Sequence, residues 1–299
     1  MKGLIFAASA AVVLAAGLAV AWFANPFSYT NTRPMDEPAA KAPQKPKADP
    51  PKPAAPPLKP VTEPPAPKPS GEQPEAKPEP LPAVPVADPK SKLTPLNKEK
   101  TLYIEKTPAG KSRVLFVTEV CLREGLLEVF LCKANTKEHE AILRTAVDAR
   151  FLHAALIAAG ATVGTPVQWL DPKTGDAKYQ PASGQTIRVL VNYNFKGKSH
   201  SHPAQEWILD KTTKKPMANE WVFAGSRFVK NPDRPNDPDY YTANNGEVIC
   251  ISNFSDSMLD LPIAVSREAN DLQFDAMPAK IPPLGSKVWV ILEPVPAKK

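Results

Sequence analysis

VLFVTEVCL (residues 114–122) and LLEVFLC (residues 126–132) decide the fold that the sequence predicts. Both segments are rich in valine, leucine and phenylalanine, and the short sequence Arg123-Glu124-Gly125 separates them. Apolar runs of this composition on either side of a turn sequence are typical of an antiparallel hairpin. We therefore expect a folded domain that begins with two paired strands.

Two helical patterns follow this hairpin. Asn135 and Glu138 have the spacing of a helix N-cap and its capping partner, and apolar residues continue the pattern. Asp148 is a favourable N-cap for a second helix over residues 149–159, which Gly160 would end. The sequence therefore predicts two short consecutive helices.

Strand patterns dominate the rest of the chain. Residues 186–195 alternate between apolar and polar or smaller side chains. Further short apolar segments occur at 167–170, 206–209, 220–223, 248–252 and 288–292. Because few strand–helix–strand intervals occur, we predict an α+β fold with a mostly antiparallel sheet and the two short consecutive helices.

The N-terminal segment predicts where the domain is located. Residues 3–24 form a run of 22 apolar or small residues without a charge, and a bilayer core requires about 20. Trp22-Phe23 at its end suit a membrane interface. Lys2 and Ala19-Val20-Ala21 instead resemble a secretory signal with a cleavage site. We expect a retained single-pass anchor, and the alternative is release into the periplasm after cleavage; both export the domain.

A proline-rich stretch separates this segment from the domain. Residues 34–95 contain 21 of the 37 prolines and no aromatic residue. Proline prevents helix and sheet propagation, and without apolar side chains nothing offsets the entropy of ordering. We divide the chain into a transmembrane anchor or signal segment (1–25), a disordered linker (26–96) and a globular domain (97–299).

Charge and cysteine content exclude some classes of function. The net charge of +6 is spread along the chain without a basic stripe, so nucleic acid is not an expected partner. Three cysteines do not make a disulfide framework, and we expect mostly reduced, partly buried thiols.

Cys121, Glu128, His139 and His153 have the side-chain types of a metal or catalytic centre. In the hairpin register predicted above, Cys121 and Glu128 share a face, and two packed helices would bring both imidazoles near it. Thiolate, carboxylate and imidazole all bind zinc, and three protein ligands plus water is the catalytic arrangement. We predict Glu128, His139 and His153 as catalytic residues, with Cys121 as an additional metal ligand. The alternative is that the carboxylate faces solvent and each histidine is an ordinary helix residue.

Other histidine and serine patterns are less specific. His139-Glu140 begins an H-E-x-x-H motif, but Leu143 replaces the second histidine, so a zincin site is not expected. His200 and His202 would point the same way on a strand, although their Lys/Ser-rich surroundings favour a surface loop. Ser226 lacks the G-x-S-x-G context of a nucleophile elbow.

Several segments, in a consistent order, resemble the YdjY-type domain of bacterial envelope proteins. They are GLLE (125–128), KEHE (137–140), HAAL (153–156), WVFAGS (221–226), SNFSD (252–256) and DLP (260–262). The resemblance covers most of residues 97–295 and implies an exported domain without an established activity. Some members are associated by name with iron–sulfur ferredoxins. This chain lacks the C-x-x-C-x-x-C spacing of such a cluster, so we expect no iron–sulfur cluster, whereas a divalent metal remains an alternative.

The sequence thus leaves two classes of function. The first is a membrane-tethered extracytoplasmic module that binds an envelope protein or polymer, or has a structural role, with residues 3–24 in the lipid bilayer. The second is a metal-dependent, hydrolase-like enzyme that uses Glu128, His139 and His153. Whether these three side chains meet in one pocket distinguishes the two.

Overall fold

The computed structural model describes residues 77–169, 179–230, 233, 235–266 and 271–296. Its largest sheet contains β1 (Lys92–Pro95), β2 (Leu102–Lys106), β3 (Ser112–Val120), β4 (Val129–Lys133), β5 (Ala141–Thr145), β8 (Thr186–Phe195), β9 (Lys198–Pro203), β12 (Trp221–Phe223), β15 (Ile249–Cys250), β16 (Leu259–Asp260) and β18 (Lys287–Pro294). Smaller sheets contain β10 (Ile208–Asp210), β11 (Lys215–Pro216) and β17 (Phe274–Ala276); β13 (Phe228–Val229) and β14 (Tyr240–Tyr241); and β6 (Gln168–Trp169) and β7 (Tyr179–Gln180). The helices are α1 (Ala149–Ala158) and the 3₁₀ helices η2 (Ala204–Trp207) and η3 (Thr242–Asn245).

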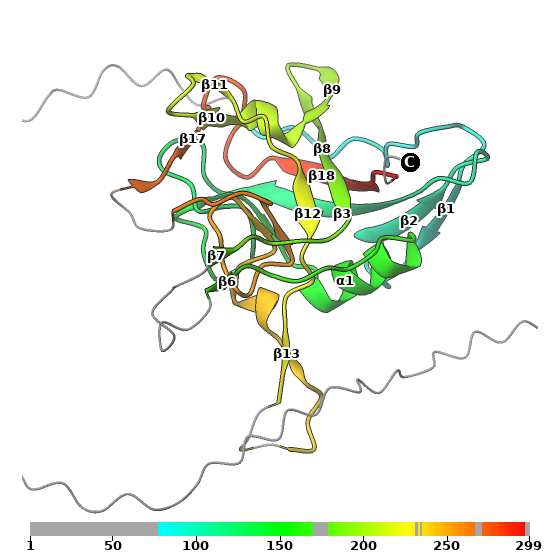
Figure 1. Cartoon of the computed structure of the whole chain (residues 1–299). Helices are drawn as coiled ribbons and strands as arrows, with labels where there is room; N and C mark the ends of the chain where they lie inside the picture. The colour runs from blue at the N-terminus through cyan, green and yellow to red at the C-terminus, as the bar shows by residue number, and fades with distance from the viewer. Residues whose placement is uncertain (1–76, 170–178, 231–232, 234, 267–270, 297–299) are drawn as a thin grey trace, which may run out of the picture. The chain divides into compact units, whose positions relative to one another are not determined.

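The largest sheet closes on itself. Its strands follow the order β3-β18-β8-β12-β16-β15-β4-β5, and β5 pairs with β3 to complete a barrel of eight strands. β1 and β2 extend the sheet from β3, and β9 extends it from β8 (Figure 1). Most neighbours are antiparallel, whereas β4–β5 and β15–β16 are parallel. A closed barrel leaves the ring without unpaired edges.

Alternation along the strands gives the barrel an apolar interior and a second apolar surface outside. In β18, Val290 belongs to the main core, whereas Trp289 and Ile291 belong to a separate apolar cluster. Successive strand side chains point to opposite faces, so one strand contributes to both clusters. The predicted alternation in residues 186–195 is confirmed, because Val189 and Val191 are buried in the main core.

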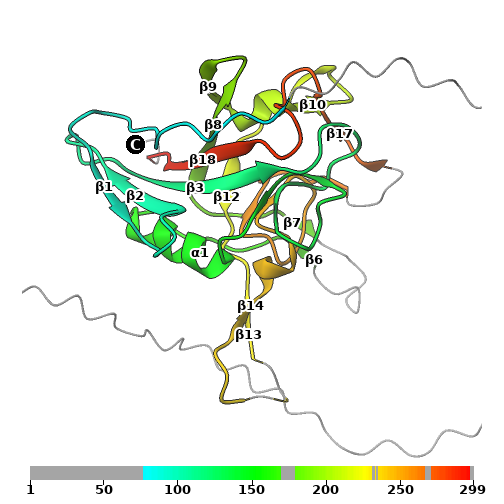
Figure 2. The ribbon, with the colours of Figure 1, turned by 180° about the vertical axis from the view of Figure 1, so that it is seen from behind.

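A segment that precedes β1 covers the outer apolar cluster. We call residues 79–89 the strap; Figure 2 shows it in cyan, beside β8 and β18. Leu81 and Val84 pack into the cluster of Trp289, and the indole Nε1 donates a hydrogen bond to Pro82 O at 3.0 Å. We assigned these residues to the linker from their proline content. The structure differs because their scattered apolar side chains find a matching surface on the sheet.

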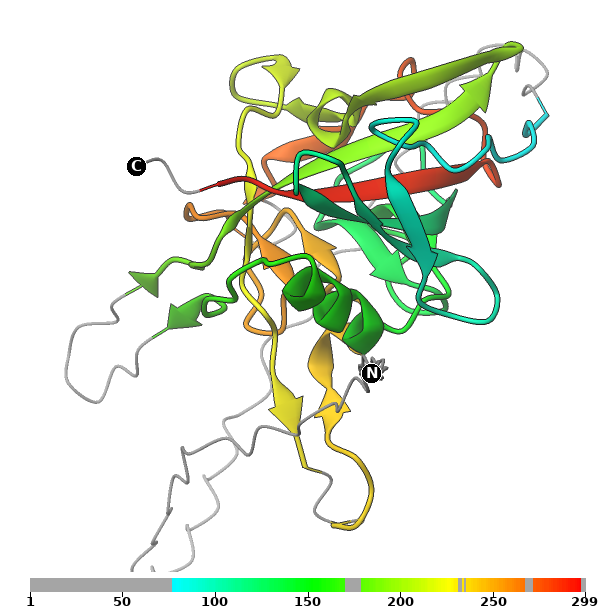
Figure 3. The same cartoon turned by 90° about the vertical axis from the view of Figure 1, so that its right-hand side faces the viewer.

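Helix α1 corresponds to the second predicted helix. Asp148 caps it, since its Oδ1 accepts a hydrogen bond from Arg150 N at 2.9 Å. Gly160, with φ of 88°, provides the left-handed conformation that follows the last turn. Leu152 and Leu156 are fully buried in the main core. Figure 3 shows α1 in green, near the arm formed by β13 and β14.

The first predicted helix does not form, and the α+β prediction with two consecutive helices is wrong. Asn135 N does donate to Glu138 Oε1, but Asn135 has φ of 66° and starts a turn rather than a helix. Ala141, Ile142 and Leu143 then belong to β5. A short apolar run is compatible with either a buried strand or a helix, and pairing on both sides selects the strand. The described residues form a mostly β fold with one α-helix.

The predicted hairpin is also absent, because β5 lies between β3 and β4. The connection after β3 instead pairs with a segment near the C-terminus. Leu127 N donates to Phe274 O at 3.0 Å, and Ala276 N donates to Gly125 O at 2.9 Å. Most strand pairs are nevertheless antiparallel, as predicted, whereas the expected pairing of residues 114–122 with residues 126–132 does not occur.

In the part of the chain that the structure describes, no helix is both long and apolar enough to cross a bilayer. The predicted membrane segment, residues 3–24, and residues 26–76 of the predicted linker lie outside the described residues.

A buried ion pair attaches the strap to the sheet. The side chain of Glu105 is fully buried, and its carboxylate accepts hydrogen bonds from Arg113 Nε and from Ala87 N, the latter at 2.7 Å. Burial alone would raise the pKa of Glu105, but the surrounding hydrogen bonds, including those of Arg113 and Ala87, lower it. Arg113 also donates to Pro85 O at 2.7 Å and to Glu293 Oε1 at 3.1 Å. The pair therefore connects β2, β3, β18 and the strap.

Arg113→Ala is expected to destabilise the domain by about 3 kcal/mol, because it leaves the Glu105 carboxylate buried without its cation. Urea unfolding of the full chain, followed by circular dichroism, measures this loss. The double variant Arg113→Ala/Glu105→Gln removes the buried charge and should recover part of the stability. A single variant as stable as the wild type would contradict the assigned role of the pair.

Candidate functional site

The structure does not gather the four predicted site residues into one group. Within the described ranges, no three His, Cys, Asp or Glu side chains are placed to share a metal ion. The hairpin register that placed Cys121 opposite Glu128 is absent, since β5 separates the two strands. Cys121 and His153 instead have separate environments, whereas Glu128 and His139 lie in and beside one network of charged side chains.

Cys121 contacts backbone carbonyls and another thiol. Its Sγ donates to Ala141 O at 3.1 Å, and it is hydrogen bonded to Cys132. This hydrogen bond and burial raise the pKa of the Cys121 thiol. All three cysteines are free, but Cys132 and Cys250 are fully buried, so the expected partial burial applies to Cys121 alone.

Glu128 belongs to a group of charged residues around Lys137, which we call the Lys137 cluster. The ammonium Nζ lies 3.2 Å from Glu128 Oε2, 2.8 Å from Glu140 Oε1 and 3.7 Å from Glu247 Oε1. It also lies 4.4 Å from the centre of the Phe254 ring, a cation–π contact. The cluster joins segments that are far apart in the sequence, from the residue before β4 to the region after β15.

The Lys137 ammonium lies between the three carboxylates, in the position that a metal ion bound by them would occupy. Burial raises the pKa of Glu128 and of Glu247, and the charge of Glu140 adds to the effect on Glu128. Burial opposes the charge of Lys137, but its carboxylate partners raise its pKa overall. Gly246, with φ of 134°, permits the approach, because a Cβ there would lie 2.9 Å from Lys137 Cδ. The close packing of the lysine indicates a structural ion network.

His139 lies at the edge of this network. Its side chain is 77 % exposed, and its Nε2 lies 3.6 Å from Glu140 Oε2. Glu128 and His139 are therefore connected only through Lys137 and Glu140, and their side chains are not placed to bind one metal ion together. The exposed imidazole is available to solvent.

His153 on α1 has a different partner, Tyr241 on β14. His153 Nδ1 lies 2.9 Å from Tyr241 Oη, and Tyr241 Oη donates to Gly225 O at 2.9 Å. The carbonyl only accepts, so the tyrosine uses its single proton there and must accept from His153. His153 therefore carries its proton on Nδ1, and burial lowers its pKa and favours this neutral form. Phe223 packs edge-on against the imidazole at 4.9 Å between ring centres.

A second buried polar group lies near β16. Asp260 Oδ1 accepts from Asn253 Nδ2 at 3.1 Å and from Leu261 N at 2.8 Å. Asn253 Oδ1 in turn accepts from Tyr179 Oη at 2.9 Å and from Val265 N at 2.7 Å. Burial raises the pKa of Asp260 to about 7. Both Asn253 and Asp260 are fully buried, so this group positions the chain around them and is closed to a ligand.

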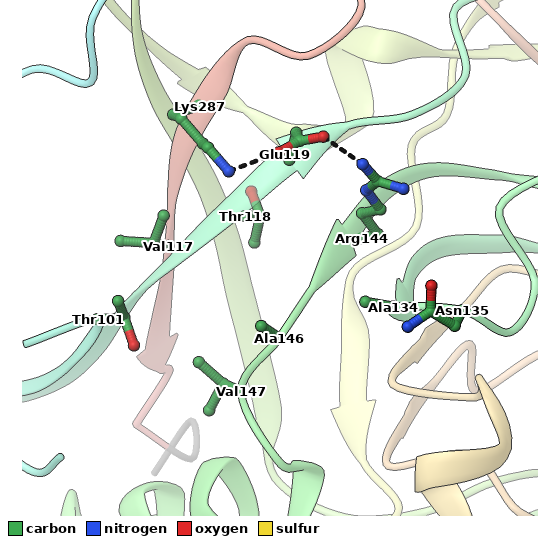
Figure 4. A pocket seen from close by; sticks show the side chains of 10 residues that line it. All are labelled: Thr101, Val117, Thr118, Glu119, Ala134, Asn135, Arg144, Ala146, Val147 and Lys287. Atoms are coloured by element: carbon green, nitrogen blue, oxygen red, sulfur yellow. Dashed lines mark hydrogen bonds and ion pairs between the residues drawn. The ribbon is translucent and has the colours of Figure 1, made fainter. Parts of the chain in front are cut away.

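An open cavity of about 380 Å³ lies near the junction between β3 and β5 (Figure 4). Glu119 at its edge is bonded to both Arg144 and Lys287, as the dashed lines in Figure 4 show. Burial would raise the pKa of Glu119, but Lys287 and Arg144 lower it. The carboxylate of Glu119 therefore offsets one of the two positive charges at the edge of this cavity.

Sequence reasoning identified Glu128 and His153 but not the residues that engage them. Lys137 was visible in the KEHE segment, where its spacing to Glu140 permits an ion pair. Tyr241 and Glu247 lie in segments without a recognisable motif. Only the three-dimensional structure assigns Tyr241 to His153 and Glu247 to Lys137.

The fold and the site define a closed, mostly antiparallel β domain whose charged and polar motif residues are engaged with one another. Residues 109–293 match the family model of the YdjY domain, and the chain belongs to this family. The resemblance carried by the six segments is thus confirmed. Comparison with curated proteins gave no significant match, and neither did comparison with solved structures.

The raised pKa of Asp260 predicts a pH-dependent stability. Its pKa is about 7 in the folded state against an ordinary value of 3.8. Between these values the folded state binds more protons, so this residue lowers the free energy of unfolding as the pH rises. Relative to Asp260→Asn, the wild type should lose about 3 kcal/mol between pH 4.5 and 8.

Urea unfolding of both proteins at several pH values measures this difference. The comparison with Asp260→Asn cancels the contributions of the other carboxylates, because both proteins share them. Parallel pH profiles for the two proteins would show that Asp260 ionises normally in the folded state.

Proposed function

We propose that this YdjY domain is a binding module of the cell envelope, displayed outside the cytoplasm on a membrane tether. The apolar run of residues 3–24 and the proline-rich stretch after it support the tether. Its partners are the lipid bilayer through residues 3–24 and an envelope protein or polymer through the domain. The absence of a basic stripe in the sequence argues against nucleic acid.

The observation that carries the binding role is that the motif residues engage one another. Glu128 is held by Lys137, and His153 is held by Tyr241. An enzyme built on Glu128, His139 and His153 would need these groups near one reacting atom. Their separate partners therefore favour a domain that acts through its surface over a metal-dependent hydrolase.

The strap supports a tether that ends at a fixed place on the domain. Its backbone carbonyls accept hydrogen bonds from three side chains of the sheet, and Leu81 and Val84 pack in the outer apolar cluster. The donors are Asn194 Nδ2 to Pro80 O at 3.1 Å, Trp289 Nε1 to Pro82 O at 3.0 Å and Arg113 Nη2 to Pro85 O at 2.7 Å. A pull on the linker would thus act on the barrel through several hydrogen bonds.

Alkaline phosphatase fused after Lys299 and expressed in a bacterium tests the location. The enzyme is active only outside the cytoplasm, so the fusion is expected to be active and to sediment with membranes. A fusion that lacks residues 3–24 serves as control and should be inactive and soluble.

The same experiment distinguishes the two versions of the N-terminus. A retained anchor gives a full-length membrane-bound chain, whereas cleavage near Ala21 gives a shortened soluble chain in the periplasm. An inactive fusion whose green fluorescent protein counterpart is fluorescent in the cytosol would refute the proposed location.

A further inference from the structure

A second open cavity, of about 510 Å³, lies beside the β8–β9 hairpin. Its lining includes Tyr193 of β8, His200 and His202 of β9, Glu206 of η2 and Lys280 after β17. The long hairpin appears at the upper right of Figure 3. Four separate segments therefore meet around this cavity.

The sequence of the hairpin explains its shape. Lys196 and Gly197 form its two-residue turn, with φ of 53° and 69°. Positive φ at both positions is the geometry that matches the twist of paired strands, and glycine favours it. Tyr193 pairs directly with His200, so the two side chains share a face. The predicted surface loop at His200 and His202 is instead this second strand of the hairpin.

Rings stack along the cavity wall. The His200 ring lies 5.3 Å from that of Tyr193 at an interplanar angle of 16°, and the His202 ring lies 5.8 Å from that of His200. His200 Nε2 lies 3.1 Å from Phe195 O, and because a carbonyl only accepts, this nitrogen carries a proton. The stack and this hydrogen bond hold the imidazoles in place.

Positive charge exceeds negative charge in the cavity. Three lysines, Lys196, Lys198 and Lys280, line it together with a single carboxylate, Glu206, which gives a net charge of +2 without the imidazoles. Within the described residues, Lys198 and Lys280 have no ion-pair partner, whereas Glu206 lies 3.4 Å from His202 Nδ1. This contrasts with the cavity of Figure 4, where Glu119 bonds to both cations.

We propose that this cavity binds a ligand with at least two negative charges, carried by phosphate or carboxylate groups. The lysine ammonium groups supply the attraction, and the stacked imidazoles supply a fixed wall for a flat or ring-shaped part of the ligand. This proposal rests on the proposed binding function and specifies the chemistry of its ligand.

Isothermal titration calorimetry of the full chain, purified in detergent, tests the proposal with pyrophosphate and with citrate as probes. Binding of pyrophosphate alone assigns the site to phosphate groups, and binding of citrate alone assigns it to carboxylates. The double variant Lys198→Ala/Lys280→Ala is expected to weaken binding by at least about tenfold. Glu206→Gln should instead strengthen binding by about two- to fivefold, because it removes the only carboxylate that lines the cavity.

The control is Lys92→Ala/Lys106→Ala, which removes the same charge from exposed positions on β1 and β2, outside this cavity. It should leave the affinity unchanged within about twofold, because the charges are distant from the bound anion and screened by salt. The two double lysine variants and Glu206→Gln all alter exposed or half-buried side chains, so each variant is expected to fold. Circular dichroism of each variant checks that the fold is preserved.

The proposal is overturned if neither probe binds the wild type, or if the control loses as much affinity as Lys198→Ala/Lys280→Ala. It is also overturned if Glu206→Gln weakens binding. The phosphatase fusion reports on the tether independently. An active, membrane-bound fusion together with absent anion binding would therefore reject the ligand and retain the location.

Discussion

The pairing of β5 on both of its edges is the constraint on which the barrel depends. β5 is parallel to β4, with Leu131 opposite Leu143, and antiparallel to β3, with Val120 opposite the same Leu143. Without the second pairing the sheet would remain open and expose two edges beside its apolar interior. Glu119 and Arg144 form the other residue pair of this junction and also bond through their side chains. Closure thus combines backbone pairing, buried leucine packing and an ion pair at one place.

Local sequence patterns predicted the elements whose form depends on nearby residues. The alternation in β8 and the Asp148 cap of α1 are both read within about ten residues. The helix expected after Asn135 failed although its capping contact to Glu138 exists. Residues Ala141–Thr145 form a strand because β3 and β4 pair with them on either side. The pairing with β3 forms only when the barrel closes.

The candidate site shows the same limit. The sequence identified Glu128 and His153 as candidate site residues, but the expectation that they act together depended on a hairpin register and a helix pair that the structure does not contain. In the structure, Glu128 meets Lys137 nine positions away, whereas His153 meets Tyr241 eighty-eight positions away. A single sequence does not show which residues make contact across a separation of eighty-eight positions. Residue chemistry was therefore predictable, whereas the grouping of the residues required the fold.

The strap and the cavity proposed for anions both contact the β8–β9 hairpin. A two-stranded ribbon that extends from a sheet is only marginally stable by itself. Here the strap braces it, since Asn194 donates to Pro80 O and Gly197 N donates to the carboxylate of Glu79. Tyr193 anchors the hairpin to the main core, where its ring packs edge-on against Trp207. The strap, which belongs to the predicted linker, therefore helps to hold the strands that shape the cavity, so the docking of the strap and the shape of the cavity depend on the same packing.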